Sequence, residues 1–206
     1  MQNSFADVWG VIRSRNTLLL AVADAGPFAL YTVALAWLPT YYHEVHGMSL
    51  VKAGSLMGMF SLAGVVSLVV ASLLSLRIHR RRPFLIIPGI LAVFAGLGSF
   101  LLADSAAVYL AVLALGFTLS FYWPVLMTIP MELPRTDPNR VSVIFATIMT
   151  LEGIFTFFSP LTVGVATDLL GSYLPGLALF SVLASSLAIA GALLPETGAG
   201  ERTTSR

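Results

Sequence analysis

Six long apolar stretches, separated by short polar breaks, dominate this chain of 206 residues. A helix needs ~20 mainly apolar residues to cross the hydrocarbon core of a bilayer, and each stretch reaches that length. The predicted membrane-spanning helices are residues 17–42, 50–76, 84–103, 106–129, 141–166 and 173–194. Little of the chain is left for a soluble domain. The sequence therefore predicts an all-α, polytopic membrane protein with six transmembrane helices.

The composition excludes several other classes of protein. Only 10% of the residues are charged, against about 25% in soluble domains. The chain has no cysteine, which excludes disulfide scaffolds, thiolate metal sites and cysteine nucleophiles. A net charge of +1 provides no bulk basic field for nucleic acid. We therefore expect the lipid bilayer as the surroundings and no nucleic acid as a partner.

The basic residues predict how the helices are oriented. With six spans, the N-terminus, the second and fourth loops and the C-terminus share one side of the membrane. Ten arginines fall on that side, and only Lys52 falls on the other. The ten are Arg13, Arg15, Arg77, Arg80, Arg81, Arg82, Arg135, Arg140, Arg202 and Arg206. Because cytoplasmic loops are enriched in Lys and Arg, we expect a plasma (cytoplasmic) membrane protein with both termini cytoplasmic.

Two short segments flank the six-helix bundle of residues 17–194. In residues 1–16, Phe5, Val8, Trp9 and Ile12 recur at helical spacing, which predicts an amphipathic helix on the cytoplasmic membrane surface. A frayed terminus is the alternative interpretation. Residues 195–206 are expected to form a cytoplasmic tail.

Two carboxylates lie well inside the predicted spans. Glu152 is ~16 Å deep in the fifth helix, and Asp24 is ~10 Å deep in the first, by helical rise. Ionisable groups at such depth usually mark ion or substrate pathways, so both are candidate substrate- or proton-coupling residues. A buried carboxyl can take up and release a proton. The alternative for Glu152 is a structural carboxylate bonded to a neighbouring hydroxyl.

Other polar residues share the helices that carry these two acids. Thr156 follows Glu152 by one helical turn, Tyr31 lies on the helix of Asp24, and the fourth helix contains Tyr122 and Trp123. The third and sixth helices contain no ionisable residue. We expect the first, fourth and fifth helices to line a polar path and the third and sixth to face lipid.

Small residues at helical spacing predict close contacts between helices. Gly54, Gly58 and Gly64 lie along the second helix, and Gly153 and Gly164 lie along the fifth. Contacts inside the bundle are a commoner use of such residues than a dimer interface, and we expect them here.

The sequence gives little support for an enzyme or for a metal or other cofactor. No histidine lies at membrane depth to serve a serine protease, Asp24 has no second membrane aspartate, and no Walker or dinucleotide motif occurs. The three histidines all lie in breaks between helices. His43 and His46, with Glu44 between them, are interpreted as solvated loop residues rather than as a metal site.

Short motifs follow one another in a characteristic order along the chain. They are Trp37–Tyr42 with Gly47, Arg77-x-x-Arg80-Arg81-Arg82-Pro83, Pro130-x-Glu132-Leu133-Pro134, Ser159-Pro160 followed by Gly164, Asp168 and Gly171-Ser172, and Leu194–Thr197. In this order they resemble the C-terminal six-helix half of a major facilitator superfamily transporter. Within the superfamily, the chain resembles the cyanate-permease-like organic-anion branch.

The resemblance implies a bundle of two inverted three-helix repeats, in a 3+3 arrangement. A weak sequence similarity between residues 26–39 and 116–130 agrees with such a repeat. In the family, the first and fourth helices of each half line the central cavity. The resemblance therefore makes cavity-lining residues of Tyr31, Tyr122, Trp123 and Thr156, with Asp24 and Glu152 beside them.

The resemblance also assigns a gating loop between the second and third helices, which contains Arg77 and Arg81. The family usually has an aspartate before the arginine and a glycine after it. Here Leu76 and His79 occupy those places, so the family's gating contact does not carry over directly.

Together these features predict secondary transport of a small-molecule substrate by alternating access, with a proton as the candidate coupled ion. One six-helix bundle supplies half of a cavity wall, so we expect a homodimer or a separate N-terminal half as partner. A truncated, non-transporting fragment or a membrane interaction module is the alternative.

Overall fold

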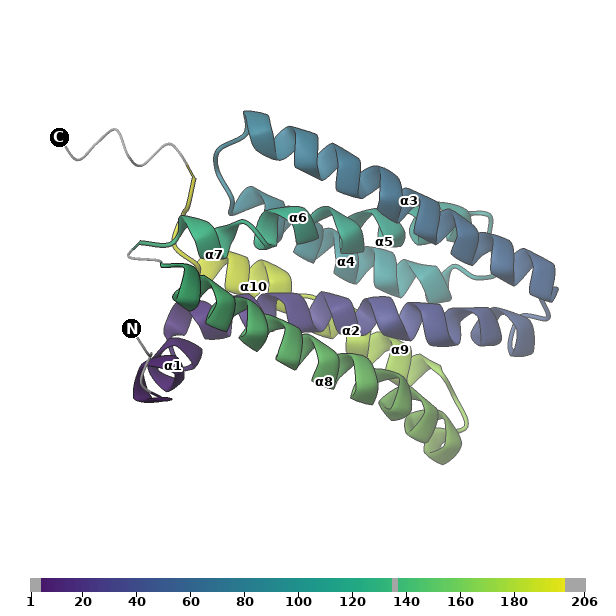
Figure 1. Ribbon diagram of the computed structural model, residues 1–206. Coiled ribbons are helices and arrows are strands. Elements are labelled where there is room, and N and C mark those ends of the chain that lie inside the picture. The colour runs from purple at the N-terminus through teal and green to yellow at the C-terminus, as the bar shows by residue number, and fades with distance from the viewer. Residues whose placement is uncertain (1–4, 135–136, 199–206) are drawn as a thin grey trace.

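The computed structural model describes residues 5–134 and 137–198, and the regular structure in those residues is entirely helical (Figure 1). Six stretches are long and apolar enough to span a membrane. Four of the predicted spans are single helices: α2 (Arg15–Glu44), α3 (Leu50–Arg77), α4 (Pro83–Leu101) and α8 (Pro138–Leu170). The other two are composite: α5 (Ala107–Phe121), α6 (Trp123–Leu126) and α7 (Ile129–Glu132), then α9 (Leu174–Leu183) and α10 (Ser186–Leu193). The six predicted spans are confirmed.

Local capping chemistry sets the ends of the long helices. The hydroxyls of Ser14 and Ser49 accept backbone N–H groups at the starts of α2 and α3, and Asp137 does the same for α8. Pro83 occupies the first turn of α4, where its missing N–H removes no helical bond. Gly171 ends α8 with φ +66°, a left-handed conformation that a side chain disfavours.

The fourth and sixth spans are interrupted, which the sequence did not indicate for the sixth. Pro124 and Pro130 lie in the first turns of α6 and α7, so the fourth span breaks where proline cannot donate to the preceding turn. The sixth span breaks at Ala184 and Ser185 without a proline. There α2 approaches so closely that Gly26 leaves no room for a side chain.

The packing pattern repeats after three spans. The first span (α2) packs most extensively on the fifth (α8), and the fourth (α5) packs equally extensively on the second (α3). The sixth span lies against the first as the third (α4) lies against the fourth. Exchanging the first three spans with the last three leaves this pattern unchanged, which is what a 3+3 repeat requires.

Burial differs strongly among the spans. The central helix α2 is the most deeply buried, and α8 and α3 are the least buried. The third and sixth spans, which we expected to face lipid, pack against each other and against α2. Within this chain it is therefore the second and fifth spans that present most of their surface outward.

The small residues divide into two groups. Gly64 lies against Ser120, and Gly164 lies against Trp37, as expected for contacts inside the bundle. At Gly54, Gly58 and Gly153 an added side chain would meet no neighbouring atom, so the expectation of internal contacts was wrong for these three. They lie on the outward faces of α3 and α8, which the bundle does not cover.

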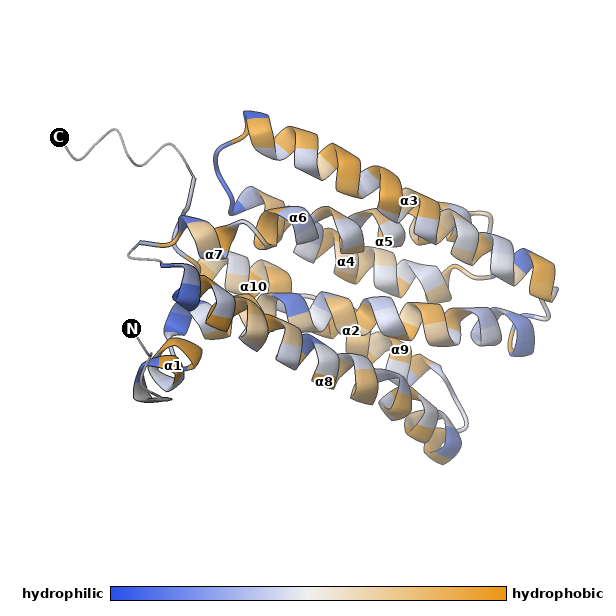
Figure 2. Ribbon diagram, viewed as in Figure 1, coloured by the Kyte–Doolittle hydropathy of each residue, from blue (hydrophilic) through white to orange (hydrophobic). Residues whose placement is uncertain are grey.

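Most hydrophilic residues gather at the two ends of the bundle, and the helices between are largely apolar except for short hydrophilic patches on α2 and α8 (Figure 2). At one end Arg15 donates to the Leu193 carbonyl, and Arg82 donates to the Leu194 carbonyl. Lys52 lies at the opposite end, in the first turn of α3. Three of the arginines on which the orientation was predicted, Arg135, Arg202 and Arg206, lie outside the described residues.

The N-terminal segment contains the short helix α1 (Phe5–Ile12), which packs on α8 and α2. The guanidinium of Arg13 lies over the Trp9 ring, 5.5 Å from its centroid. The Phe5 side chain and residues 1–4 lie outside the described structure. At the other terminus, Glu196 accepts hydrogen bonds from the backbone N–H groups of Arg81 and Arg82, while residues 199–206 of the predicted tail are not described.

Candidate functional site

Three of the predicted site residues meet where α2, α8 and the junction of α5 with α6 come together. Asp24 is completely buried on α2, and Tyr122 at the junction is 1% exposed. The Tyr122 hydroxyl donates a hydrogen bond of 3.0 Å to Oδ1 of Asp24. Glu152 is half-buried on α8, and its carboxyl group faces that of Asp24 closely enough for the two to interact. The sequence left open whether the two acids meet, and the structure places them together.

One oxygen of each acid has no hydrogen-bond donor. Asp24 Oδ2 and Glu152 Oε2 are buried, and neither accepts a hydrogen bond. Leaving a buried acceptor unsatisfied costs about 1–3 kcal/mol, and more if it is charged. The nearest basic residues along the same helices are Arg15 and Arg140, roughly 14 and 18 Å away by helical rise. The pair is thus arranged to receive a donor: a proton, or an N–H group or cation of a ligand.

Further polar contacts continue along the same α2–α8 interface. The hydroxyls of Thr32 and Ser159 lie 3.0 Å apart and share a hydrogen bond. The Trp37 indole N–H donates to the Pro160 carbonyl at 2.9 Å. Neither Thr32 nor Trp37 stood out in the sequence as a bridging residue, because a hydroxyl or an indole in an apolar helix is common. We call this row of contacts, from Asp24 to Trp37 on α2, the α2–α8 seam.

The remaining residues predicted to line a cavity lie around this seam without joining the carboxylates. Thr156 is half-buried one turn beyond Glu152. Tyr31 packs on the rings of Phe28 and Phe60, at centroid distances of 5.7 and 5.4 Å. Trp123 follows Tyr122 directly but points outward and is 38% exposed. Tyr122 is therefore the one of the four that the structure brings into contact with the acids.

The two candidate gating arginines differ in their surroundings. Arg81 forms a double hydrogen bond with Glu132, with Nη2 to Oε1 at 2.7 Å and Nε to both carboxylate oxygens at 3.2 Å. It also donates to the Ser75 carbonyl at 3.1 Å. These bonds join the α3–α4 loop to α7 and to the end of α3. Arg77, by contrast, is exposed at the end of α3. Of the two arginines, Arg81 is therefore the one that links the α3–α4 loop to α7.

A second polar cluster connects the loops at the opposite end. His46 contacts Asp104 through Nδ1 at 2.5 Å and the Tyr41 hydroxyl through Nε2 at 3.0 Å. The interpretation of His46 as a solvated loop residue was therefore wrong. The Tyr173 hydroxyl donates to Glu44 at 2.6 Å, and this bond to the carboxylate raises the pKa of Tyr173. His43 lies apart, with Nδ1 2.8 Å from the Met48 carbonyl.

These observations define a class of protein: an integral membrane protein of six spans in a 3+3 repeat, with an acidic pair in its interior. The sequence profile of the Major Facilitator Superfamily matches residues 2–160, more than half of the chain. The chain belongs to this superfamily, whose members are transporters rather than enzymes and carry small solutes across membranes. No curated protein matches the chain at a significant level.

Proposed function

We propose that this chain forms one half of an alternating-access carrier that couples transport of a small solute to proton binding at Asp24 and Glu152. The observation that carries the proposal is the pair of buried oxygens, Asp24 Oδ2 and Glu152 Oε2, that lack a donor. A single proton held between two carboxyl groups supplies that donor and removes the repulsion between like charges.

Proton binding at this pair would act directly on helix packing. The two acids are on α2 and α8. Within the described residues, the α2–α8 interface and the α3–α5 interface are equally extensive and larger than any other. When the pair loses its proton, two like charges face each other across the seam, and separation of the helices relieves the repulsion. A conformational equilibrium shifts only if the ligand binds one state better than the other, and a proton shared at a closed seam meets that condition.

A second bundle completes the carrier in this proposal, supplied by a homodimer or by a separate N-terminal half. Support comes from the outward faces of α3 and α8, which are the least buried spans and carry Gly54, Gly58 and Gly153 in the open. Close helix packing in membranes uses small residues of this kind. Substrate would bind near the midplane between the bundles, with Tyr31, Trp123 and Thr156 as candidate lining residues.

The arginine distribution and the resemblance supply the remaining parts of the proposal. The arginine-rich end of the bundle supports a plasma-membrane location with both termini in the cytoplasm. The bond between Arg81 and Glu132 would close the cytoplasmic side and break when that side opens. The cyanate-permease-like resemblance makes small organic anions the first substrates to test, and a proton carried with an anion balances its charge as a symport.

Proteoliposomes containing the full chain, with and without a coexpressed N-terminal half, provide the test. We expect uptake of a small organic anion to depend on an inward proton gradient, and we expect Glu152→Gln to abolish that dependence. Asp168→Asn, at an exposed acid near the end of α8, is the matched control and should retain it. Unchanged gradient-driven uptake by Glu152→Gln would rule out the coupling role.

A direct reading of the proton separates this proposal from a non-transporting interaction module. Infrared difference spectra between acidic and alkaline buffers should show the carbonyl band of a protonated carboxyl. That band should be lost in Asp24→Asn and in Glu152→Gln. A chain that shows neither the band nor uptake with any partner would be the interaction module instead.

A further inference from the structure

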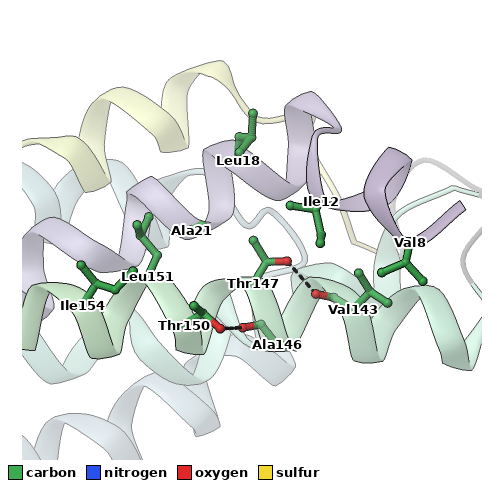
Figure 3. A pocket seen from close by; sticks show the side chains of 10 residues that line it. All are labelled: Val8, Ile12, Leu18, Ala21, Val143, Ala146, Thr147, Thr150, Leu151 and Ile154. Atoms are coloured by element: carbon green, nitrogen blue, oxygen red, sulfur yellow. Dashed lines mark hydrogen bonds between the residues drawn. The ribbon is translucent and has the colours of Figure 1, made fainter. Parts of the chain in front are cut away.

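An apolar groove lies between α1, the first turns of α2, and α8 (Figure 3). It has a volume of about 350 Å³, within the ~300–1,000 Å³ typical of small-molecule sites. We call it the α1 groove. Its lining residues are Val8, Ile12, Leu18, Ala21, Val143, Ala146, Thr147, Thr150, Leu151 and Ile154.

The α1 groove offers an occupant almost no polar group. Its two threonines turn their hydroxyls onto their own helix: Thr147 donates to the Val143 carbonyl at 2.8 Å, and Thr150 donates to the Ala146 carbonyl at 2.7 Å (Figure 3). Only methyl groups and aliphatic chains then face the groove. Leu18 and Ile154 at its edges are about half exposed, so the groove is open to the outside of the bundle. This surface suits an alkyl chain and not a polar solute.

The dimensions of the groove match one leaflet of a bilayer. Along α8 it extends from Val143 to Ile154, eleven residues or roughly 16 Å at 1.5 Å per residue. Half of the ~30 Å hydrocarbon core is about 15 Å. The groove begins beside α1, where the Trp9 ring stacks with Arg13, and Trp and Arg side chains favour the headgroup level.

Two arginines lie close in sequence to lining residues at the headgroup end of the groove. Arg13 follows the lining residue Ile12. Arg140 precedes Val143 by three residues, on the same face of α8, and its Nε is buried without a hydrogen-bond partner. Of the neighbouring acids, Asp137 is engaged as the cap of α8, and Asp7 precedes Val8. At this end of the groove, the buried side-chain atom without a hydrogen-bond partner among the described residues is thus a cationic donor, Arg140 Nε.

Two other apolar grooves lack this combination. One lies between α3 and α5, around Leu62, Val66 and Leu110, and the other lies along the last turns of α8, around Phe158 and Leu170. Their volumes are about 470 and 520 Å³. In the sequence, no lysine or arginine occurs within four positions of their lining residues. Ordinary contact with lipid tails explains those two grooves, but it does not explain an arginine donor at the end of the α1 groove.

We propose that the α1 groove binds an anionic phospholipid of the arginine-side leaflet, with one acyl chain in the groove and the phosphate on Arg13 and Arg140. The phosphate supplies the acceptor that Arg140 Nε lacks, and arginine pairs well with phosphate. The bound chain fills the space between α1, α2 and α8. It thereby contacts the two helices that carry Asp24 and Glu152.

Native mass spectrometry of the purified full chain, titrated with palmitoyl-oleoyl phosphatidylglycerol or phosphatidylcholine, tests the proposal without a transport assay. We expect phosphatidylglycerol to be retained preferentially. Arg140→Gln should weaken its retention by about fivefold, the effect of one basic residue near an anionic lipid, and Arg140→Lys should weaken it less. Arg80→Gln, an exposed arginine away from the groove, is the matched control and should leave retention unchanged.

A second pair of variants tests the acyl-chain site separately from the charge. Val143→Trp fills the α1 groove and should reduce phosphatidylglycerol retention while the arginines stay in place. Val66→Trp fills the groove between α3 and α5 and should not. Equal retention of the two lipids by the unmodified chain, or full retention by a folded Val143→Trp variant, would overturn the proposal.

Discussion

The hydroxyl of Tyr122 donates a 3.0 Å hydrogen bond to Oδ1 of Asp24 across 98 residues of sequence. Both side chains are buried, and Asp24 Oδ2 already lacks a donor. This bond fixes which oxygen of Asp24 is free to face Glu152, so Tyr122 orients the acidic pair.

Tyr122→Phe should destabilise the chain, because it leaves both oxygens of Asp24 buried without a donor. Loss of a buried hydrogen bond of this kind costs about 1–3 kcal/mol, which a thermal melt in detergent can resolve. Tyr109→Phe is the control, since the Tyr109 hydroxyl makes no hydrogen bond within the described residues. Equal melting temperatures for both variants would show that the bond contributes nothing.

Asp24 and Glu152 should be energetically coupled. Asp24→Asn places an amide N–H₂ beside Glu152 and supplies the missing donor permanently, and Glu152→Gln does the same for Asp24. Either change removes the need for the other, so the two effects on unfolding free energy should not add. We expect a coupling of about 0.5–3 kcal/mol in a double-mutant cycle. The pair Asp24→Asn and Asp168→Asn should be additive, and additivity in both cycles would mean that the two carboxyls do not interact.

Local features of the sequence were enough to predict the six spans and several of their ends. Apolar length defined the spans, and the side-chain oxygen of Ser49 marked the start of α3. Asp24 and Glu152 stood out because a carboxylate in an apolar run is costly. These inferences need only the residues within one helix, which is why the structure confirms the spans and the start of α3.

Relationships between helices were harder to predict. The contact of Asp24 with Glu152, and the bond from Trp37 to the Pro160 carbonyl, depend on the rotation and crossing of α2 and α8, which no single helix encodes. Glycine spacing showed that a helix has a small-residue face but not which way the face points, and Gly54 points outward. His46 could not be distinguished from a solvated loop histidine by sequence, because its partner Asp104 is 58 residues away along the chain.

Arg81 rather than Arg77 should stabilise the arginine-rich end of the bundle. The pair of Arg81 with Glu132 is largely buried, at 13% and 21% side-chain exposure, so Arg81→Gln should cost about 1.5–3 kcal/mol. Arg77→Gln, at an exposed position, should cost little. Exchanging the charges, with Arg81→Glu and Glu132→Arg together, should restore only part of the loss because the bond to the Ser75 carbonyl is also removed. If Arg77→Gln lowered the free energy of unfolding as much as Arg81→Gln, the stabilising role would not belong to Arg81 alone.

The contact of Tyr173 with Glu44 should weaken at alkaline pH. The carboxylate raises the pKa of Tyr173 above its ordinary value, so the contribution of the contact to stability is complete below about pH 10, the ordinary pKa of tyrosine. It is lost as the pH rises through the higher pKa of the folded protein. Subtracting the tyrosinate absorbance of Tyr173→Phe from that of the unmodified chain isolates this one titration, and Glu44→Gln should move its midpoint to lower pH. An unmoved midpoint would show that the 2.6 Å bond does not form in solution.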